Sequence, residues 1–221
     1  MDTETIQEFS QLMESRAHIY QTLSRCFETE MTSEFAQELQ TSFTFSSDND
    51  DLNEVFGQIK AYASDLSEED LEEMAVVYNR VFYGMGPRNC VKAYPYESVY
   101  TSKSGYMMQE AYEQVKNDYL RAGFEKNPDF TEPEDHMAVE LAFMAMLCTK
   151  TREALAEGNE EAAEALVGKQ KKFVANHLMA WLDRFTSELK KAADEGFYAW
   201  LALGTRLFVH YDQEILNELT D

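Results

Sequence analysis

The sequence predicts an all-α protein that forms one globular multi-helix domain. Apolar residues recur three and four positions apart over most of the 221 residues, which is the spacing that lines one face of a helix. Gly and Pro occur only 9 and 4 times, whereas an all-β fold needs many turns. Because no segment alternates apolar and polar residues as a half-buried strand does, we expect helices joined by mostly short connections.

Three helices are expected before residue 65. Apolar residues from Ile6 to Phe27 mark one face of a long first helix. A shorter helix over Ser33–Thr41 begins at residues that are typical helix caps. The aspartates of the polar segment 46–51 can cap a third helix, over Leu52–Ala63.

A fourth helix is predicted from Ser67 to about Phe82, and an irregular segment follows it. Ser67 and Asp70 come close to a capping box, with acids in the first turn, where the helix dipole favours them. Segment 83–105 then holds three glycines and two prolines, which argues against a helix. It is longer than the roughly 12–15 residues of ordinary connections. Its several tyrosines fit a packed, functional loop better than disorder.

The second half of the chain is expected to be helical again. Gly123 is a plausible helix stop. Thr131 to Glu134 has the form of a capping box, with Pro133 in the first turn, where its missing N–H has no cost. Residues 126–131 would join an N-terminal lobe, about 1–125, to a C-terminal lobe, about 131–221. The helices expected here are 106–122, about 133–157, 160–191 and about 195–218.

The formal net charge of −22 excludes several classes of partner. Such a surface repels phosphate backbones, so we expect no nucleic acid. No window is long and apolar enough for a membrane span, so we expect no stable membrane insertion. The N-terminus lacks the basic start and apolar run of a signal peptide. Three cysteines without CxxC spacing indicate free thiols in a reducing compartment, so we expect a cytoplasmic protein.

The stretch Phe130–Met144 attracts attention because acids and a histidine precede a nearly apolar helix. His136 and Glu140 are four residues apart and share a helix face, a spacing that can hold a metal. Asp135 and His136 are neighbours, which point about 100° apart on a helix, so Asp135 cannot easily orient the imidazole. A capped helix start that also serves as a recognition edge is the third interpretation. Glu140 is then either paired in the core or faces a groove.

Conventional enzyme chemistry has little support in the sequence. A GxSxG elbow, a phosphate-binding P-loop, a dinucleotide glycine motif and a CxxC pair are all missing. Two carboxylate–histidine pairs would be needed for a di-iron bundle, and the sequence lacks them. We therefore expect no enzyme and no cofactor. A metal-dependent hydrolase that uses Asp135, His136 and Glu140 is the alternative.

Several motifs together resemble the TorD/DmsD family of cytoplasmic redox-enzyme maturation chaperones. They are Tyr78-x-x-Val81-Phe82-x-Gly84, then Gly86-Pro87, then the run from Pro95 to Tyr100 that reads PYESVY, then Glu132-Pro133-x-Asp135-His136. A later helix with Phe173, His177, Leu178, Trp181 and Phe185 also looks like that family. The resemblance covers most of residues 74–185. Tyr78 and Val81 stand where tryptophan and leucine are also common, a change that would reshape a binding pocket.

The resemblance implies an all-helical chaperone for a molybdenum-containing oxidoreductase. Its partners would be the twin-arginine signal peptide and the body of the catalytic subunit, held until cofactor insertion is complete. An assembly factor that binds the enzyme without a signal peptide is a further alternative. Guanine-nucleotide (GTP) binding, proposed for some members, stays open, although no phosphate-binding loop is present. The oligomeric state, monomer or helix-exchanged dimer, is also open.

The residues expected to bind the peptide come from these motifs. The resemblance points to the aromatic helix and the EPxDH turn, and the matching loop adds further side chains. Asp135 is expected to pair with a cationic group, because carboxylates bind guanidinium groups through paired hydrogen bonds. His136 is expected to be a hydrogen-bond partner or to organise the turn. The expected set is Tyr78, Val81, Phe82, Pro87, Tyr96, Glu97, Tyr100, Glu132, Pro133, Asp135, His136 and Glu140.

Overall fold

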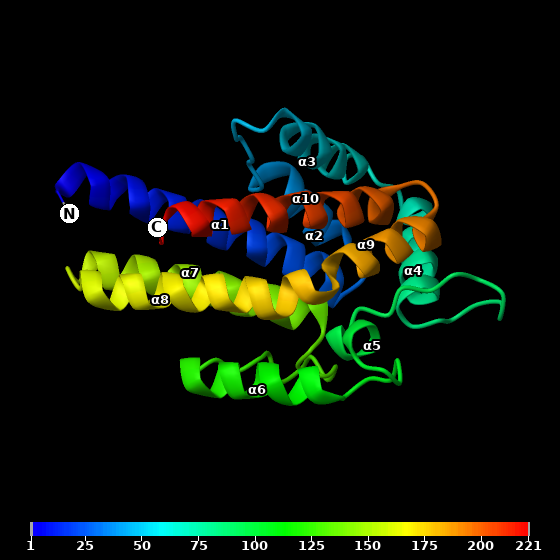
Figure 1. Cartoon of the computed structure of the whole chain (residues 1–221). Coiled ribbons are helices and arrows are strands. Elements are labelled where there is room, and N and C mark those ends of the chain that lie inside the picture. The colour runs from blue at the N-terminus through cyan, green and yellow to red at the C-terminus, as the bar shows by residue number, and fades with distance from the viewer. Residues whose placement is uncertain (1, 221) are drawn as a thin grey trace.

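The structure, a computed structural model that describes residues 2–220, confirms the all-α prediction. Its helices pack side by side in a bundle (Figure 1). Among the described residues the β-type pairing is one isolated antiparallel bridge, between Tyr96 and His136. In chain order the helices are α1 (Thr3–Glu28), α2 (Ser33–Thr41), α3 (Asp50–Tyr62), α4 (Glu68–Phe82), α5 (Glu97–Thr101), α6 (Glu110–Ala122), α7 (Met137–Ala156), α8 (Glu160–Phe173), the π-helical turn η1 (Val174–Leu178), α9 (Met179–Ala193) and α10 (Phe197–Glu218).

One hydrophobic core runs through both halves of the chain. Helix α1 packs along α7, which in turn packs on α8, while α10 packs on α9 and α3. Because neighbours cover α7 on several sides, its apolar residues are buried all round rather than along one stripe. Figure 1 shows α1 in blue beside the C-terminal helices, so residues far apart in sequence share the same core.

Helix caps account for most of the predicted boundaries. The Ser67 side chain accepts from the Asp70 amide, and the Asp70 carboxylate accepts from the Ser67 amide, so the predicted capping box is complete. Gly123 ends α6 in the left-handed region, with φ of 64°. The Asn159 side chain caps α8 by accepting from the amide of Ala162. The capping box and the helix stop at Gly123 are therefore confirmed predictions.

Three predictions for these segments are wrong, and one helix is less regular than predicted. Segment 83–105 contains the short helix α5. Helix α6 begins at Glu110 rather than near residue 106, because Met108 has a φ of 56°, which a right-handed helix does not allow. Helix α7 begins at Met137, so Pro133 lies outside its first turn. The predicted helix 160–191 changes to π-helical geometry at Val174–Leu178.

A buried polar network ties three helices together around Arg16. The Arg16 guanidinium donates to both carboxylate oxygens of Asp212 at 2.5 and 2.9 Å, and to the side-chain oxygen of Gln170 at 2.6 Å. The Tyr20 hydroxyl donates to Asp212 at 2.6 Å. These residues come from α1, α8 and α10, and all four are buried. A buried charge needs such partners, since an unpaired one is costly.

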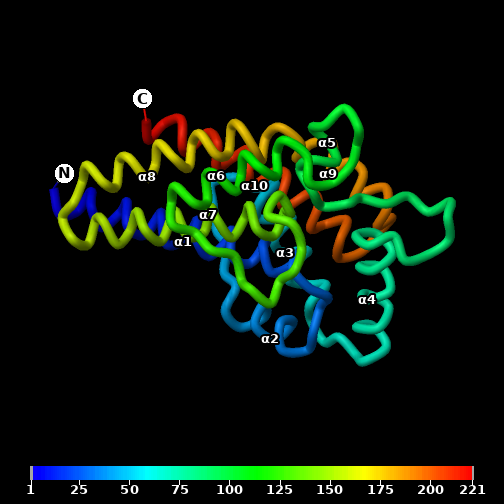
Figure 2. Tube along the Cα trace, turned by 90° about the horizontal axis from the view of Figure 1, so that it is seen from below, coloured from blue at the N-terminus to red at the C-terminus, as the bar shows by residue number. Residues whose placement is uncertain are grey.

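The ends of the bundle differ. The start of α1 and the end of α10 lie at one end, and the connection between α4 and α5 extends away from the helices at the other end, as Figures 1 and 2 show. Over the described residues, no helix has the length and apolar character needed to cross a membrane. Cys26 and Cys148 are buried free thiols, whereas Cys90 in the extended connection is partly exposed.

Candidate functional site

Backbone hydrogen bonds dock two of the sequence motifs onto each other. The Met137 amide donates to the Pro95 carbonyl at 2.8 Å, and the Glu97 amide donates to the Asp135 carbonyl at 2.9 Å. The residues just before α7 are therefore held extended against segment 95–98, which explains why α7 begins later than its sequence predicts.

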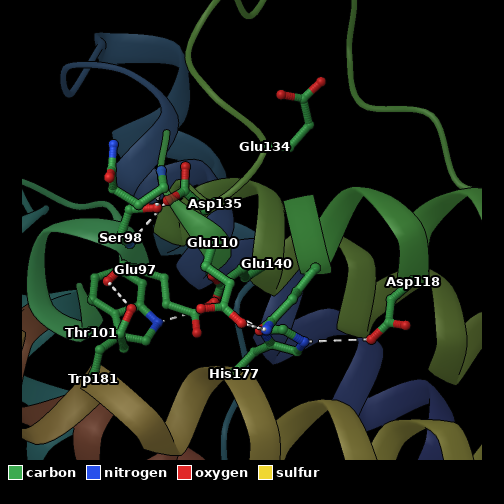
Figure 3. A network of polar contacts seen from close by, with 12 residues as sticks. Glu97, Ser98, Thr101, Glu110, Asp118, Glu134, Asp135, Glu140, His177 and Trp181 are labelled. Carbon is green, nitrogen blue, oxygen red and sulfur yellow. Dashed lines mark hydrogen bonds and ion pairs between the residues drawn. The ribbon is translucent and has the colours of Figure 1, made fainter. Parts of the chain in front are cut away.

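The Asp135 side chain is part of this contact. Its Oδ2 accepts a 2.9 Å hydrogen bond from the Ser98 amide in the first turn of α5, as Figure 3 shows. The residue is fully buried. Burial raises the pKa of the Asp135 carboxyl, and the hydrogen bonds from Ser98 oppose that shift. Asp135, although distant in sequence from α5, thus caps the N-terminus of that helix.

His136 organises the turn from within. Its Nδ1 accepts a 3.1 Å hydrogen bond from the Ala138 amide, so the imidazole caps α7. The rings of Tyr96 and Phe130 lie edge-on to it, each 5.1 Å away between centroids. Burial lowers the pKa of His136 to about 3, and the charge of Lys126 adds to the effect. The imidazole is therefore neutral at physiological pH, with its proton on Nε2.

A network of acidic side chains with His177 and Trp181 lies next to the docked motifs (Figure 3). The His177 Nδ1 lies 2.9 Å from the Glu97 carboxylate, and its Nε2 lies 3.4 Å from Asp118. The Trp181 indole donates to Glu140 at 3.2 Å. Burial, followed by the neighbouring Glu97 charge, raises the pKa of Glu140 well above its ordinary value. Burial thus favours the protonated form of Glu140.

The aromatic motif of α4 also faces inward. Tyr78, Val81 and Phe82 are all buried. The Tyr78 hydroxyl donates to the Phe27 carbonyl at 3.0 Å, and the Phe82 ring meets the Phe27 ring edge-on at 5.9 Å. The motif therefore anchors α4 to the end of α1.

Three adjoining cavities run along the outside of these motifs and meet at Glu28. Their volumes are about 200, 300 and 330 Å³, and Glu28 lines all three. Apolar side chains form one wall beside α7, and tyrosines form the other end beside α4. We call them together the Glu28 groove; it is lined by Gln21, Ser24, Arg25, Glu28, Thr29, Glu30, Tyr78, Asn79, Tyr83, Met85, Phe124, Glu125, Lys126, Asn127, Asp129, Phe130, Ala138, Val139 and Ala142.

Negative charge predominates in the Glu28 groove. Its two cations are already engaged, since the Lys126 amine donates to the Glu132 carbonyl and the Arg25 guanidinium lies 5.0 Å from the centre of the Phe35 ring. The groove therefore suits a ligand that has positive charge and apolar surface. Its acids are Glu28, Glu30, Glu125 and Asp129.

Comparisons with known proteins place the chain in a family. Residues 46–187 match the family described as nitrate reductase delta subunit. The chain is 31% identical over 200 residues to the chaperone protein TorD of Photobacterium profundum, covering 87% of this chain and 90% of the relative. The chain belongs to the TorD family of redox-enzyme maturation chaperones. TorD of Vibrio cholerae is 28% identical, with 97% of each chain covered.

The fold of this TorD-family chain has a solved counterpart. The crystal structure of a candidate redox enzyme maturation protein from Archaeoglobus fulgidus superposes with a TM-score of 0.54. The match covers 88% of this chain and 93% of that chain at 18% identity, so it shows the fold alone.

TorD relatives are chaperones, so this family member is not an enzyme. The hydrolase alternative also lacks geometry, because the Asp135 carboxylate and the His136 imidazole bind different backbone amides. In the part of the chain that the structure describes, no group of three or more His, Cys, Asp or Glu side chains is arranged to hold a metal ion.

The structure of the TorD-family chain brings together most of the residues predicted from the motifs. Tyr96 donates to the Glu132 carboxylate, and burial followed by the Glu132 charge raises the pKa of Tyr83 at the end of α4, so the aromatic helix ends close to the EPxDH turn. Tyr100 is buried and stacks on Trp181 at 5.5 Å. The clustered residues are Tyr78, Val81, Phe82, Tyr96, Glu97, Tyr100, Glu132, Pro133, Asp135, His136 and Glu140.

Two aspects of the candidate site differ from expectation. Pro87 lies exposed in the extended connection, away from the cluster. Glu140 is fully buried, so it takes the core position rather than the groove position. Most of the Glu28 groove was not expected: Glu28, Glu30, Phe124 and Phe130 belong to none of the motifs. The acids Glu28 and Glu30 at the end of the first helix are the signal that could have indicated it.

Proposed function

We propose that this chain is a cytoplasmic chaperone for a molybdenum-containing oxidoreductase and that the Glu28 groove holds the twin-arginine signal peptide of the catalytic subunit. The observation that carries the proposal is the groove itself, which combines carboxylates with aromatic and aliphatic walls beside the family motifs. The chaperone would keep the peptide until cofactor insertion and folding of the enzyme are complete.

The chemistry of such a peptide matches the groove. A twin-arginine signal has a cationic start and an apolar segment. Guanidinium groups bind carboxylates through paired hydrogen bonds, and Glu28 stands where the three cavities meet. The apolar segment can pack on Phe124 and Phe130 beside α7.

The buried motif residues have a positioning role in this proposal. Asp135 and His136 hold α5 and the start of α7 in place, and the Phe130 ring packs on the His136 ring. A substitution at Asp135 or His136 would therefore weaken peptide binding by displacing the groove wall. Direct contact of Asp135 with an arginine stays a prediction, since its carboxylate faces the Ser98 amide in this structure.

Fluorescence anisotropy with a labelled synthetic peptide tests the proposal. The peptide carries two adjacent arginines before an apolar segment, and a matched peptide carries two glutamines in their place. Glu28→Gln should weaken binding of the arginine peptide about five-fold, the effect of losing one solvent-accessible ion pair of about 1 kcal/mol. Binding should also weaken as salt rises, because screening reduces attraction between opposite charges.

Glu157→Gln is the matched control. Glu157 is exposed at the far end of α7 and the variant removes the same charge. It should leave the affinity unchanged. Equal affinity of the two peptides for the wild-type chain, or equal effects of Glu28→Gln and Glu157→Gln, would refute the assignment of the groove.

A further inference from the structure

An acid-free segment interrupts this strongly acidic chain. The sequence has 41 Asp and Glu residues, yet none lies between Met74 and Tyr96. The same segment contains Arg80, Arg88 and Lys92. Among the described residues, none of these three side chains forms an ion pair. The end of α4 and the connection after it therefore present uncompensated positive charge on a molecule whose net charge is −22.

Large apolar side chains are exposed at the same place. Val76 is 66% exposed, Met85 65% and Val91 50%. Val76 and Arg80 are four residues apart and share a face of α4. The Gly86 backbone lies against Arg80, because a β-carbon at Gly86 would be 3.2 Å from the Arg80 Cγ.

These side chains form a basic and apolar surface that we call the loop patch. It consists of Val76, Arg80, Met85, Arg88, Val91 and Lys92. Figures 1 and 2 show that the connection carrying most of it extends beyond the helices, so it is accessible to a large partner. Exposed large apolar side chains with charged neighbours are typical of protein interaction sites.

The loop patch adjoins the Glu28 groove. Met85 belongs to both, because it lines the cavity that contains Glu28, Glu30 and Tyr83. The charge therefore changes sign over a short distance, from the acids of the groove to the cations of the patch. A ligand that fills both would need positive charge followed by negative charge along one chain.

We infer that the loop patch docks an acidic, partly apolar segment of the same client polypeptide whose signal peptide lies in the Glu28 groove. This inference rests on the proposed function and adds a second contact to it. Charge complementarity selects an acidic partner, and Val76, Met85 and Val91 require apolar side chains between the acids. Two linked contacts raise the affinity for a client that carries both segments over that for a free signal peptide.

Labelled peptides of three kinds test the inference by anisotropy. The first joins the two-arginine signal sequence through a flexible linker to a tail rich in Glu and Leu. The second has a tail in which Gln replaces Glu, and the third is the acidic tail alone. Each is titrated with the wild-type chain, with Arg88→Gln/Lys92→Gln, and with Lys169→Gln/Lys172→Gln. The last pair is exposed on α8 and gives a control of equal charge change.

The wild-type chain should bind the acidic-tailed peptide more tightly than the Gln-tailed one. Arg88→Gln/Lys92→Gln should remove most of that advantage, about five-fold for two surface charges, and leave the Gln-tailed peptide unaffected. Val91→Ser should also reduce this difference in affinity, because it removes an apolar side chain from the patch. The control pair should retain it. Circular dichroism checks that all variants keep their helix content.

Equal affinity of the two tailed peptides for the wild-type chain overturns the inference while the groove assignment stands. If the Gln-tailed peptide does not bind, and the acidic-tailed peptide binds no more tightly than the tail alone and depends on Arg88 and Lys92, the patch stands and the proposed function fails. Two further results would assign the patch to another occupant and overturn the inference. One is patch-dependent binding to phosphatidylserine-containing vesicles, and the other is a patch-dependent dimer in sedimentation velocity.

Discussion

The Ser98 amide donates a 2.9 Å hydrogen bond to the Asp135 carboxylate across 37 residues of sequence. This contact fixes α5 to the start of α7 and makes a motif acid part of the framework. An acid that the motif suggests for direct binding is therefore first of all a structural residue in this fold.

Replacing Asp135 tests that role. Asp135→Ala should lower the free energy of unfolding by about 1–3 kcal/mol, because the buried Ser98 amide loses its acceptor. Helix content should change little, since α5 has five residues. Asp135→Asn keeps a side-chain oxygen that can accept from that amide, so its free energy of unfolding should fall less. Urea unfolding followed by circular dichroism measures both, and equal losses would show that the hydrogen bond is unimportant.

Glu140 predicts a pH dependence with a definite sign. Its pKa in the folded state is raised above the ordinary 4.5, so its contribution to stability is complete below that pH and is lost as pH rises through the folded-state pKa. Glu140→Gln mimics the protonated carboxyl. It should therefore gain stability relative to wild type as pH rises above about 4.5 and until the folded-state carboxyl has ionised, by at most about 1.4 kcal/mol per pH unit.

Urea unfolding at several pH values measures the difference between the two curves. Taking the difference removes the contribution of groups common to both chains. Glu157→Gln changes an exposed acid, so its free energy of unfolding should vary with pH as that of the wild type does. Parallel curves for Glu140→Gln as well would mean that Glu140 titrates normally in the folded chain.

The buried ion pair between Arg16 and Asp212 should be sensitive to loss of one partner. Asp212→Ala leaves the buried guanidinium without its carboxylate, at an expected cost of about 3–5 kcal/mol of unfolding free energy. The exposed pair of Arg152 and Glu14, with a 2.6 Å contact, is the comparison. Glu14→Ala should cost about 0.2–1 kcal/mol. Chemical denaturation measures both variants. If Asp212→Ala and Glu14→Ala lost similar amounts of unfolding free energy, burial would not distinguish the two ion pairs.

Replacing two helical glycines by alanine should change the stability of the protein in opposite directions. A β-carbon at Gly204 in α10 would lie 2.9 Å from Ile59 and 3.2 Å from Val55, so Gly204→Ala should destabilise by about 1–3 kcal/mol through overpacking. Gly168 in α8 has no such neighbour, and Gly168→Ala should stabilise by about 0.5–1 kcal/mol. Thermal unfolding compares them, and a shift of equal sign would disprove this helix packing.

Local sequence patterns predicted the helices well because caps and apolar spacing act within a few residues. The Ser67–Asp70 box and Gly123 are examples. The start of α7 could not be predicted this way, since the extended residues before it are held by Pro95 and Glu97 from a distant segment. The local pattern around Pro133 favours a helix, and long-range pairing overrides it.

The candidate site was predictable in part for the same reason. Motif residues such as Tyr78 and His136 are buried parts of the framework, and each forms a hydrogen bond with the backbone. The groove above them depends on where the end of α1 meets Phe124 and Phe130, and nothing in the local sequence specifies that meeting. The predicted division into two lobes stays a prediction, and α1 packs along α7 across it.

The π-helical turn at Val174–Leu178 has a consequence for how this region tolerates length changes. A π-turn accommodates one residue more than an α-helix would at that point, and each residue of an α-helix rotates by 100°. Removing one residue here would therefore let α8 and α9 join as one regular α-helix without turning the residues that follow. Trp181 would keep its contact with Glu140, and Phe185 its contact with Tyr100. A one-residue deletion in the regular part of α8 would instead rotate everything after it by about 100°, so these two helices tolerate a change of length at the π-turn and not elsewhere.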